Sequence, residues 1–323
     1  MKLQSKYQSG IPVVPYTARG LGRATSTSFS PSLFGAGNVV PGESGPGGPA
    51  QPEYTATVRE TYPSASLAND WGSYTTAFIT AQGYEPNNTL YAVGICSDDA
   101  DAFAVAGNIG QFPTTMNPFL GPFYSGGLAG YPFVGSVGLN AYASHITYTT
   151  TGSLFITTTP HIGITSDGQV GYQYRKGQDP APASASSNCG AVHGAVNWIL
   201  NSSGGNPPNI NNAPFNNGNY EFWELTNIVF PFSASLSGSV NENVAYATSI
   251  ISSASFAYIY ANSASYHDAA TGSNVFVLGG IFINTDYNYQ AYTTVNQFWK
   301  YTATGTGIWT NLTSTYCDGL FNL

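Results

Sequence analysis

The stretch Glu221–Leu312 decides the fold that the sequence predicts. It contains, in order, EFWELTNIVFPFSASL (221–236), NENVAYATSIISSASFAYIYA (241–261), SNVFVLGGIFIN (273–284), NYQAYTTVNQFWKYTA (288–303) and GIWTNL (307–312). Each run is rich in β-branched and aromatic residues and is bounded by Gly, Pro, Asn, Asp or Ser, which is typical of strands separated by turns. No run shows apolar residues at helical spacing for more than about two turns. We therefore predict an all-β chain that buries its apolar faces in a sandwich or barrel.

The composition agrees with an all-β protein that is poor in charge. Of the 323 residues 7% are charged and 14% are aromatic, whereas about a quarter of a typical soluble domain is charged. The aromatic content excludes the disordered class. Because β proteins usually protect their strand edges with charges, this surface indicates that neighbouring copies of the chain cover much of it. The alternative is a monomer that its net charge of −8 keeps soluble.

The chain divides into four segments by composition. Residues 1–52 form an extended arm that is rich in proline and glycine, which forbids a continuous helix or central strand. A first β domain follows at 53–180 and a second at 220–323, with a linker at 181–219. We expect two short helices: one in SLANDWGSYTTAFITAQG (66–83), and one inside the linker in NCGAVHGAVNWIL (188–200).

The arm carries a positive charge that the rest of the chain lacks. Its first 23 residues hold no acid and four basic residues, Lys2, Lys6, Arg19 and Arg23. The remainder holds four basic and 16 acidic residues. A basic arm on an acidic body indicates an anionic partner, either nucleic acid or lipid head groups, and a solvated tail is the alternative. The start MKLQSKYQSG has no apolar run, so we expect no secretory signal.

Residue types that bind metals occur without a recognisable spacing. The three cysteines are Cys96, Cys189 and Cys317, and the four histidines are His145, His161, His193 and His267. Three distant cysteines indicate neither a disulfide framework nor a local zinc motif. No histidine has a second ligand at helical metal spacing, so we expect hydrogen-bonded strand or loop residues. We assign no metal site, no cofactor and no catalytic residue.

Two acidic clusters allow a functional interpretation and a structural one. The first consists of Asp98, Asp99 and Asp101. It could bind calcium with backbone carbonyls, but the EF-hand pattern is missing, and we interpret it as a solvated turn. In the second, Glu221 and Glu224 flank Trp223, as a carboxylate pair in a glycosidase could. On a strand, positions three apart point to opposite faces, so we interpret both as residues at the start of a strand.

The basic arm, the two β-rich halves and the connector with one short helix carry a resemblance. Together they resemble the double jelly-roll major capsid proteins of tailless icosahedral bacteriophages with an internal membrane. The resemblance implies two jelly-roll β-barrels and homotrimeric, pseudo-hexameric capsomers that assemble into the shell of a virion. It implies a structural protein rather than an enzyme. The expected partners are other copies, penton or other minor virion proteins, and membrane lipid head groups or the genome at the arm.

Two further interpretations stay open from the sequence. The first is a secreted or surface module, such as a lectin-like sandwich, an adhesin or a filament subunit, in which Tyr and Trp would stack on carbohydrate. Glycan binding without assembly would favour it. The second is a β-sandwich hydrolase, which only the scattered carboxylates support.

Overall fold

The computed structural model describes nine stretches of the chain. They are residues 51–96, 119–132, 136–146, 152–174, 185–202, 205–263, 274–286, 289–302 and 307–321. The basic arm residues Lys2, Lys6, Arg19 and Arg23 lie outside these stretches, and so do Asp98, Asp99 and Asp101. The placement of these residues therefore stays a prediction.

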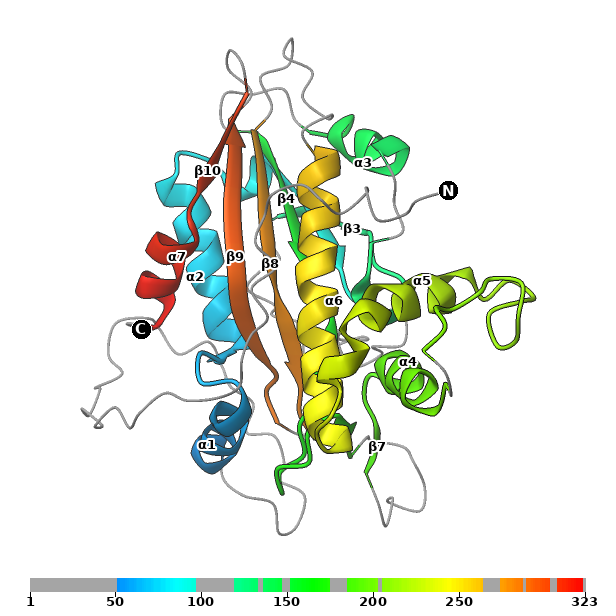
Figure 1. Cartoon of the computed structure of the whole chain (residues 1–323). Helices are drawn as coiled ribbons and strands as arrows, with labels where there is room; N and C mark the ends of the chain where they lie inside the picture. The colour runs from blue at the N-terminus through cyan, green and yellow to red at the C-terminus, as the bar shows by residue number, and fades with distance from the viewer. Residues whose placement is uncertain are drawn as a thin grey trace.

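One mixed sheet forms the centre of the molecule (Figure 1). Its strand order is β1–β9–β8–β4–β2–β3, with β10 paired to β9 and β5 paired to β8. The neighbours β3, β2, β4 and β8 run parallel, as β5 does to β8, whereas β9 is antiparallel to β8, β1 and β10. The strand bounds are β1 Ser66–Leu67, β2 Thr89–Gly94, β3 Leu120–Tyr124, β4 Ser153–Thr158, β5 His161–Gly163, β8 Asn274–Asn284, β9 Tyr292–Thr302 and β10 Ile308–Asn311, and a separate pair consists of β6 Tyr172–Gln173 and β7 Ser186–Ser187.

Helices cover both faces of this sheet. The helices of the described residues are α1 Gln51–Thr61, α2 Ala68–Ala81, α3 Ser136–Ala143, α4 Gly190–Asn201, α5 Tyr220–Val229, α6 Val240–Ser263 and α7 Thr313–Phe321, with 3-10 turns η2 Pro86–Asn88, η4 Leu128–Gly130 and η5 Phe230–Ser235. The long helix α6 runs along β8 and β4 on one face, next to α4 and α5, and α2 and α7 pack near β9 on the other (Figure 1). The result is a layered α/β fold.

The side chains of the central strands are buried on both faces. Along β8, Val275 and Val277 pack in one apolar cluster with Phe256 of α6. The alternate residues Phe276 and Leu278 pack in another with α2 and α7. Every residue of β2 and β4 is buried, as is usual for parallel strands between two helical layers.

The prediction of an all-β double jelly roll is therefore wrong. Segments 53–180 and 220–323 both supply strands to the same sheet, so neither is a jelly-roll barrel. Two runs that were predicted as strands form helices instead. Residues 221–236 lie in α5 and the 3-10 turn η5, and residues 241–261 lie in α6. The predicted short helices at 66–83 and 188–200 are confirmed as α2 and α4.

The sequence carries two signals for helix α6. Ser239 and Glu242 form a capping box: the Ser239 N–H donates to Glu242 Oε2 at 2.8 Å, and the Glu242 N–H donates to Ser239 Oγ at 3.3 Å. The fully buried residues also follow a helical period, Val244, Ala247, Thr248, Ile251, Ser255 and Ile259. The threonine and the serine in this series interrupt the apolar pattern, and the many Ser, Thr and Tyr residues of the helix resemble strand composition.

By length and composition α6 could cross a membrane, with a hydropathy of 1.2 over its most apolar window. Its packing shows a different role, because it lies along β8 and β4 and its residues Val244, Ile251 and Ile259 are fully buried. We therefore regard α6 as a core helix that packs on the sheet.

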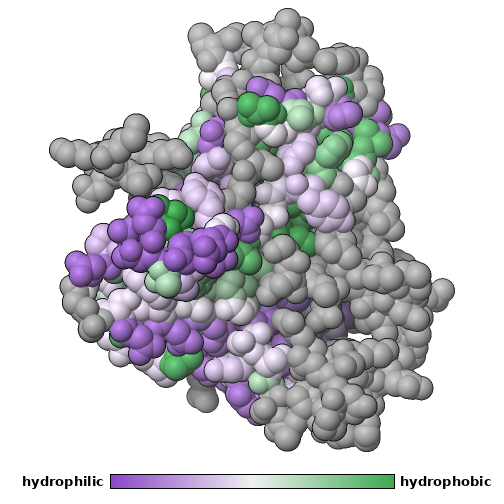
Figure 2. All heavy atoms as spheres, turned by 90° about the vertical axis from the view of Figure 1, so that its right-hand side faces the viewer, coloured by the Kyte–Doolittle hydropathy of each residue, from purple (hydrophilic) through white to green (hydrophobic). Residues whose placement is uncertain are grey.

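On the side of the molecule that carries α4 and α5, the described residues at the surface are mostly hydrophilic, with apolar residues scattered among them (Figure 2).

Candidate metal centre

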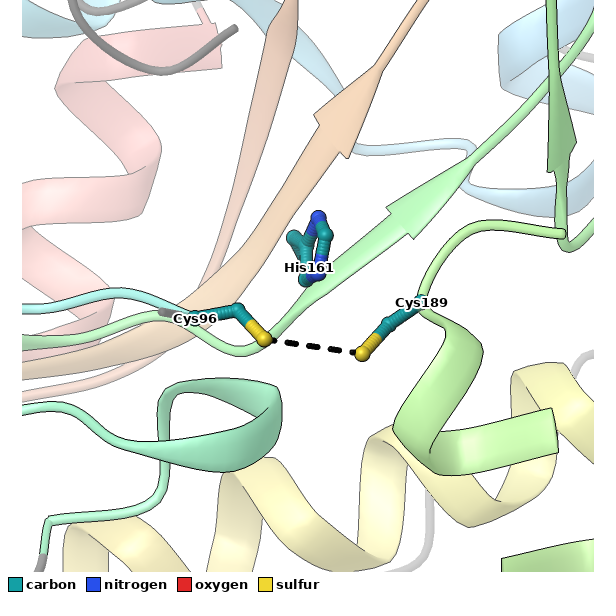
Figure 3. Close-up of side chains that lie close together, drawn as sticks. All are labelled: Cys96, His161 and Cys189. Atoms are coloured by element: carbon teal, nitrogen blue, oxygen red, sulfur yellow. Dashed lines mark hydrogen bonds between the residues drawn. The ribbon is translucent and has the colours of Figure 1, made fainter. Parts of the chain in front are cut away.

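Three residues that are far apart in the sequence meet at the carboxyl edge of the parallel strands (Figure 3). Cys96 lies two residues beyond the end of β2, and His161 opens β5, three residues beyond the end of β4. Cys189 is the N-cap residue of α4. Parallel strands bring their carboxyl ends to one edge of a sheet, which is where ligands bind in open α/β folds.

The ligand atoms of Cys96, His161 and Cys189 are close enough to share one metal ion. All lie within 4.8 Å of one another, and the two Sγ atoms are 3.6 Å apart. Tetrahedral zinc with Zn–S bonds of about 2.3 Å places two sulfurs about 3.8 Å apart. A disulfide would need about 2.05 Å. The sulfur separation therefore fits zinc, and a small inward shift of the imidazole would complete the three-ligand set.

The chemistry of the three donors also fits zinc. Cys96 is 2% exposed, and His161 and Cys189 are fully buried. Two thiolates would balance the charge of a divalent cation, so the occupied site would bury no net charge. Two thiolates and one imidazole leave a fourth position open, as in catalytic zinc sites.

The imidazole of His161 is oriented by Asn284, the last residue of β8. Its Nδ1 lies 2.7 Å from Asn284 Oδ1, and both side chains are fully buried. Because a carbonyl oxygen only accepts hydrogen bonds, Nδ1 carries the proton, and the lone pair is on Nε2. Such outer contacts fix the tautomer and the ring orientation of histidine ligands.

Cys96 also has an outer contact. The backbone N–H of Ala129, in η4, donates to Cys96 Sγ at 2.9 Å. The hydrogen bond to Cys189 and burial raise the pKa of the Cys96 thiol far above its usual range, and the neighbouring His161 opposes this with a smaller effect. A divalent cation would replace the thiol proton and provide the positive charge that stabilises the thiolate.

Sequence reasoning missed this site because its residues have no local motif. The intervals between the three positions are 65 and 28 residues, and only the sheet brings them together. The available signal was position, because Cys96 comes directly after the strand-like run TLYAVGI (89–95) and His161 directly after SLFITTTP (153–160). His161 is a hydrogen-bonded strand residue, as expected, but no local pattern indicated that Cys96 and Cys189 lie beside it.

The remaining candidates lie elsewhere. Cys317 on α7 is half-buried, His145 is exposed, and His193 on α4 lies 2.7 Å from the Gly171 carbonyl oxygen through Nε2. His267 lies outside the described stretches. None of the first three belongs to the cluster of ligand atoms.

Glu221 and Glu224 are not at the start of a strand. Both lie on α5, where residues three apart share a face. Glu221 Oε2 accepts the Leu128 N–H at 3.1 Å, and Glu224 is buried. The interpretation of both residues as the start of a strand is therefore wrong, because they lie in a helix. Glu221 contacts η4, the same turn whose Ala129 N–H donates to Cys96 Sγ.

Comparisons with known proteins agree on one family. A family model described as limiting CO2-inducible proteins B/C beta carbonic anhydrases matches residues 65–301, a range that includes all three candidate ligands. The solved structure of PtLCIB4, a homolog of the limiting CO2-inducible protein LCIB, is similar with a TM-score of 0.62 and 21% identity over 79% of this chain and 98% of that one. The structure of LCIB itself is similar with a TM-score of 0.53 and 17% identity over 78% and 96%. A search of the curated proteins finds no match.

These findings overturn the capsid interpretation in all its parts. The family match and the shared fold are those of a carbonic anhydrase family. The predicted bacteriophage capsid role, the homotrimeric capsomers and the virion location are wrong. So are the predicted penton, membrane-lipid and genome partners, and the lectin-like or adhesin alternative. The prediction that the chain is not an enzyme is also wrong, because the family is one of enzymes and the fold assembles a Cys–His–Cys site.

Proposed function

Because the chain belongs to the family of limiting CO2-inducible B/C beta carbonic anhydrases, we propose that it catalyses the reversible hydration of CO2 at a zinc ion. The reaction adds water to CO2 and yields bicarbonate and a proton. One observation carries the proposal: two cysteines and one histidine, all buried, lie within 4.8 Å of one another at the carboxyl edge of the parallel sheet.

Each protein group has a separate role in this proposal. The Cys96 and Cys189 thiolates and the His161 imidazole would hold the zinc ion. When bound, zinc acts as a Lewis acid and lowers the pKa of water from about 15.7 to about 7, which provides hydroxide at neutral pH. Asn284 holds the imidazole ring in its ligating tautomer. The Ala129 N–H holds the Cys96 sulfur.

The surroundings of the ligands strengthen their electrostatic effect. Cys96 and Cys189 belong to an apolar cluster with Ile162, Ala129 and Val192, all fully buried. Charges interact more strongly where water is excluded. The side chains around the two cysteines therefore favour a tightly held cation over two separated thiolates.

The same two sulfurs could in principle form a redox dithiol, but the site is poorly suited to that role. Thiol–disulfide exchange needs a thiolate that a partner can reach. Cys96 is 2% exposed and Cys189 is fully buried, and the pKa of the Cys96 thiol is raised. Zinc-dependent hydration is therefore the function that the geometry supports best.

The test combines metal content with stopped-flow CO2 hydration followed by a pH indicator. We expect the full chain to bind about one zinc ion and to accelerate the reaction. The ligand variants Cys96→Ser and His161→Ala should lose more zinc affinity than the 10–100-fold that outer contacts typically cost. Cys317→Ser and His145→Ala are matched controls with the same chemistry away from the site. Zinc-loaded protein that hydrates CO2 no faster than buffer would overturn the proposal.

A further inference from the structure

The turn η4 connects the metal centre to helix α5 through two successive backbone amides. The Leu128 N–H donates to Glu221 Oε2 at 3.1 Å. The next amide, that of Ala129, donates to Cys96 Sγ at 2.9 Å. One short turn therefore binds a carboxylate on one side and a candidate metal ligand on the other.

The backbone of this turn has an unusual conformation. Ala129 has φ 54° and ψ 20° and is fully buried. Residues other than glycine rarely adopt this left-handed backbone conformation, and they keep it only where the surrounding structure imposes it. Such residues occur preferentially at functional sites.

Close packing leaves the turn little freedom. Gly130 follows with φ 73°, and a Cβ there would lie 3.1 Å from the Gly94 carbonyl oxygen and 3.2 Å from Pro160 Cα. The turn is therefore wedged between the ends of β2 and β4, the strands that precede Cys96 and His161. On the side that faces α5, the turn is held by the Glu221 carboxylate, which accepts the Leu128 N–H.

The amide of Ala129 has a direct effect on the sulfur. A hydrogen bond donated to a charged acceptor is shorter and stronger than one between neutral groups, and it favours the charged form of the acceptor. It also fixes the position of the sulfur, as outer contacts do for metal ligands. Whatever holds the Ala129 N–H in place therefore contributes to metal affinity.

We propose that Glu221 is a positioning residue of the metal centre: its carboxylate holds the Leu128 amide, and the turn thereby aims the Ala129 amide at the Cys96 sulfur. The proposal rests on the metal site of the proposed function but concerns metal binding itself. It assigns to a surface helix a role in a site to which it contributes no ligand.

The test compares two variants of equal size that differ in the acceptor. Glu221→Gln keeps an oxygen for the Leu128 N–H, whereas Glu221→Met does not, and both lose the charge at the start of α5. The probe is Co2+ alone, titrated into the metal-free full chain and followed by the sulfur-to-cobalt charge-transfer absorption. We expect Glu221→Met to weaken Co2+ binding about 10-fold or more and to shift the absorption band, and Glu221→Gln to stay within about threefold of the unmodified chain.

A control variant separates positioning from general stability. Glu242 also accepts backbone amides, at the start of α6, so Glu242→Ala should lower the unfolding temperature and leave Co2+ affinity unchanged. If Glu221→Met does not fold, Glu221→Ala takes its place.

The proposal is overturned if Glu221→Met binds Co2+ as tightly as the unmodified chain, or if Glu221→Gln is as weak as Glu221→Met. It is also overturned if the unmodified chain binds no Co2+. A chain that binds Co2+ but whose zinc form hydrates no CO2 would refute the proposed function alone, because the affinities of the two Glu221 variants would still decide the role of Glu221.

Discussion

Replacing Asn284 should weaken zinc binding although Asn284 is not a ligand. In Asn284→Ala the His161 Nδ1–H loses the acceptor at 2.7 Å, in a place where both side chains are fully buried. Leaving a buried donor unsatisfied costs about 1–3 kcal/mol. The imidazole avoids this cost by rotating or by changing tautomer, and either change takes the Nε2 lone pair away from the metal position.

The expected loss of affinity follows from that cost. Outer contacts of metal-bound histidines are typically worth 10–100-fold in affinity, which corresponds to about 1.4–2.8 kcal/mol. The two ranges overlap, so the cost of an unsatisfied Nδ1–H is large enough to account for a loss of this size. The backbone of residue 284 keeps its own contact, since the Ile164 N–H donates to the Asn284 carbonyl at 2.9 Å. Asn284→Ala should therefore keep the fold.

Competition against a chromophoric zinc chelator measures this loss, with CO2 hydration as a second readout. Asn284→Asp retains an oxygen acceptor and should stay within about threefold of the unmodified affinity. Asn243→Ala is a control for buried asparagines: Asn243 is 3% exposed and makes hydrogen bonds of 3.0 and 3.1 Å to Gly238. It should lower stability without changing zinc affinity. If Asn284→Ala binds zinc within about twofold of the unmodified chain, the reasoning about His161 is refuted.

Two further predictions concern stability. Burial lowers the pKa of His193 below its ordinary value of 6.5, although the hydrogen bond to Gly171 opposes this shift. Below about pH 6.5 the unfolded chain therefore binds more protons at this residue than the folded chain does. The free energy of unfolding should fall as the pH drops through that value. Denaturant unfolding of metal-free protein between pH 7.5 and 5 should show this fall, and His193→Gln should flatten it; an equal slope in both proteins would contradict the assignment. At the bulge in β8, a Cβ on Gly280 would lie 2.0 Å from the Thr294 carbonyl oxygen, so Gly280→Ala should destabilise by at least about 1–3 kcal/mol. The control Gly83→Ala adds a Cβ in open space at φ 89°, so it measures backbone strain without a clash. A loss for Gly280→Ala no larger than that for Gly83→Ala would show that strand movement relieves the clash.

Several elements could be predicted from local pattern because that pattern reports burial. The runs at β2, β4, β8 and β9 are dense in β-branched and aromatic residues, and all four are strands. The apolar residues Val192, Val196 and Ile199 recur at helical spacing and are buried in α4. The strands β2 and β4 are buried on both faces and therefore read as continuous runs, whereas α4 buries one face and its apolar residues recur at helical spacing.

Although α6 begins with a capping box of Ser239 and Glu242, composition alone did not predict helices α5 and α6. Their Ser, Thr and Tyr residues have only moderate helix propensity, so local composition favoured strands. The helices form because they bury one face against the sheet, and Phe256 and Ile259 of α6 pack against Val277 of β8. Once these runs were assigned to strands, the low charge content suggested a capsid surface. In the structure both helices are largely covered by neighbouring elements, and few of their described residues are exposed, among them Tyr220 and Glu242.

The sequence by itself determined the strand-forming runs at β2, β4, β8 and β9 and the two helices α2 and α4. Only the tertiary structure decided that Cys96, His161 and Cys189 share one place and that Asn284 and Ala129 support them. The physical reason is that a local pattern records how each residue meets its layer, but not which distant strand lies beside it. Parallel pairing of β2, β4 and β8 brings their carboxyl ends to one edge, and that long-range pairing creates the site.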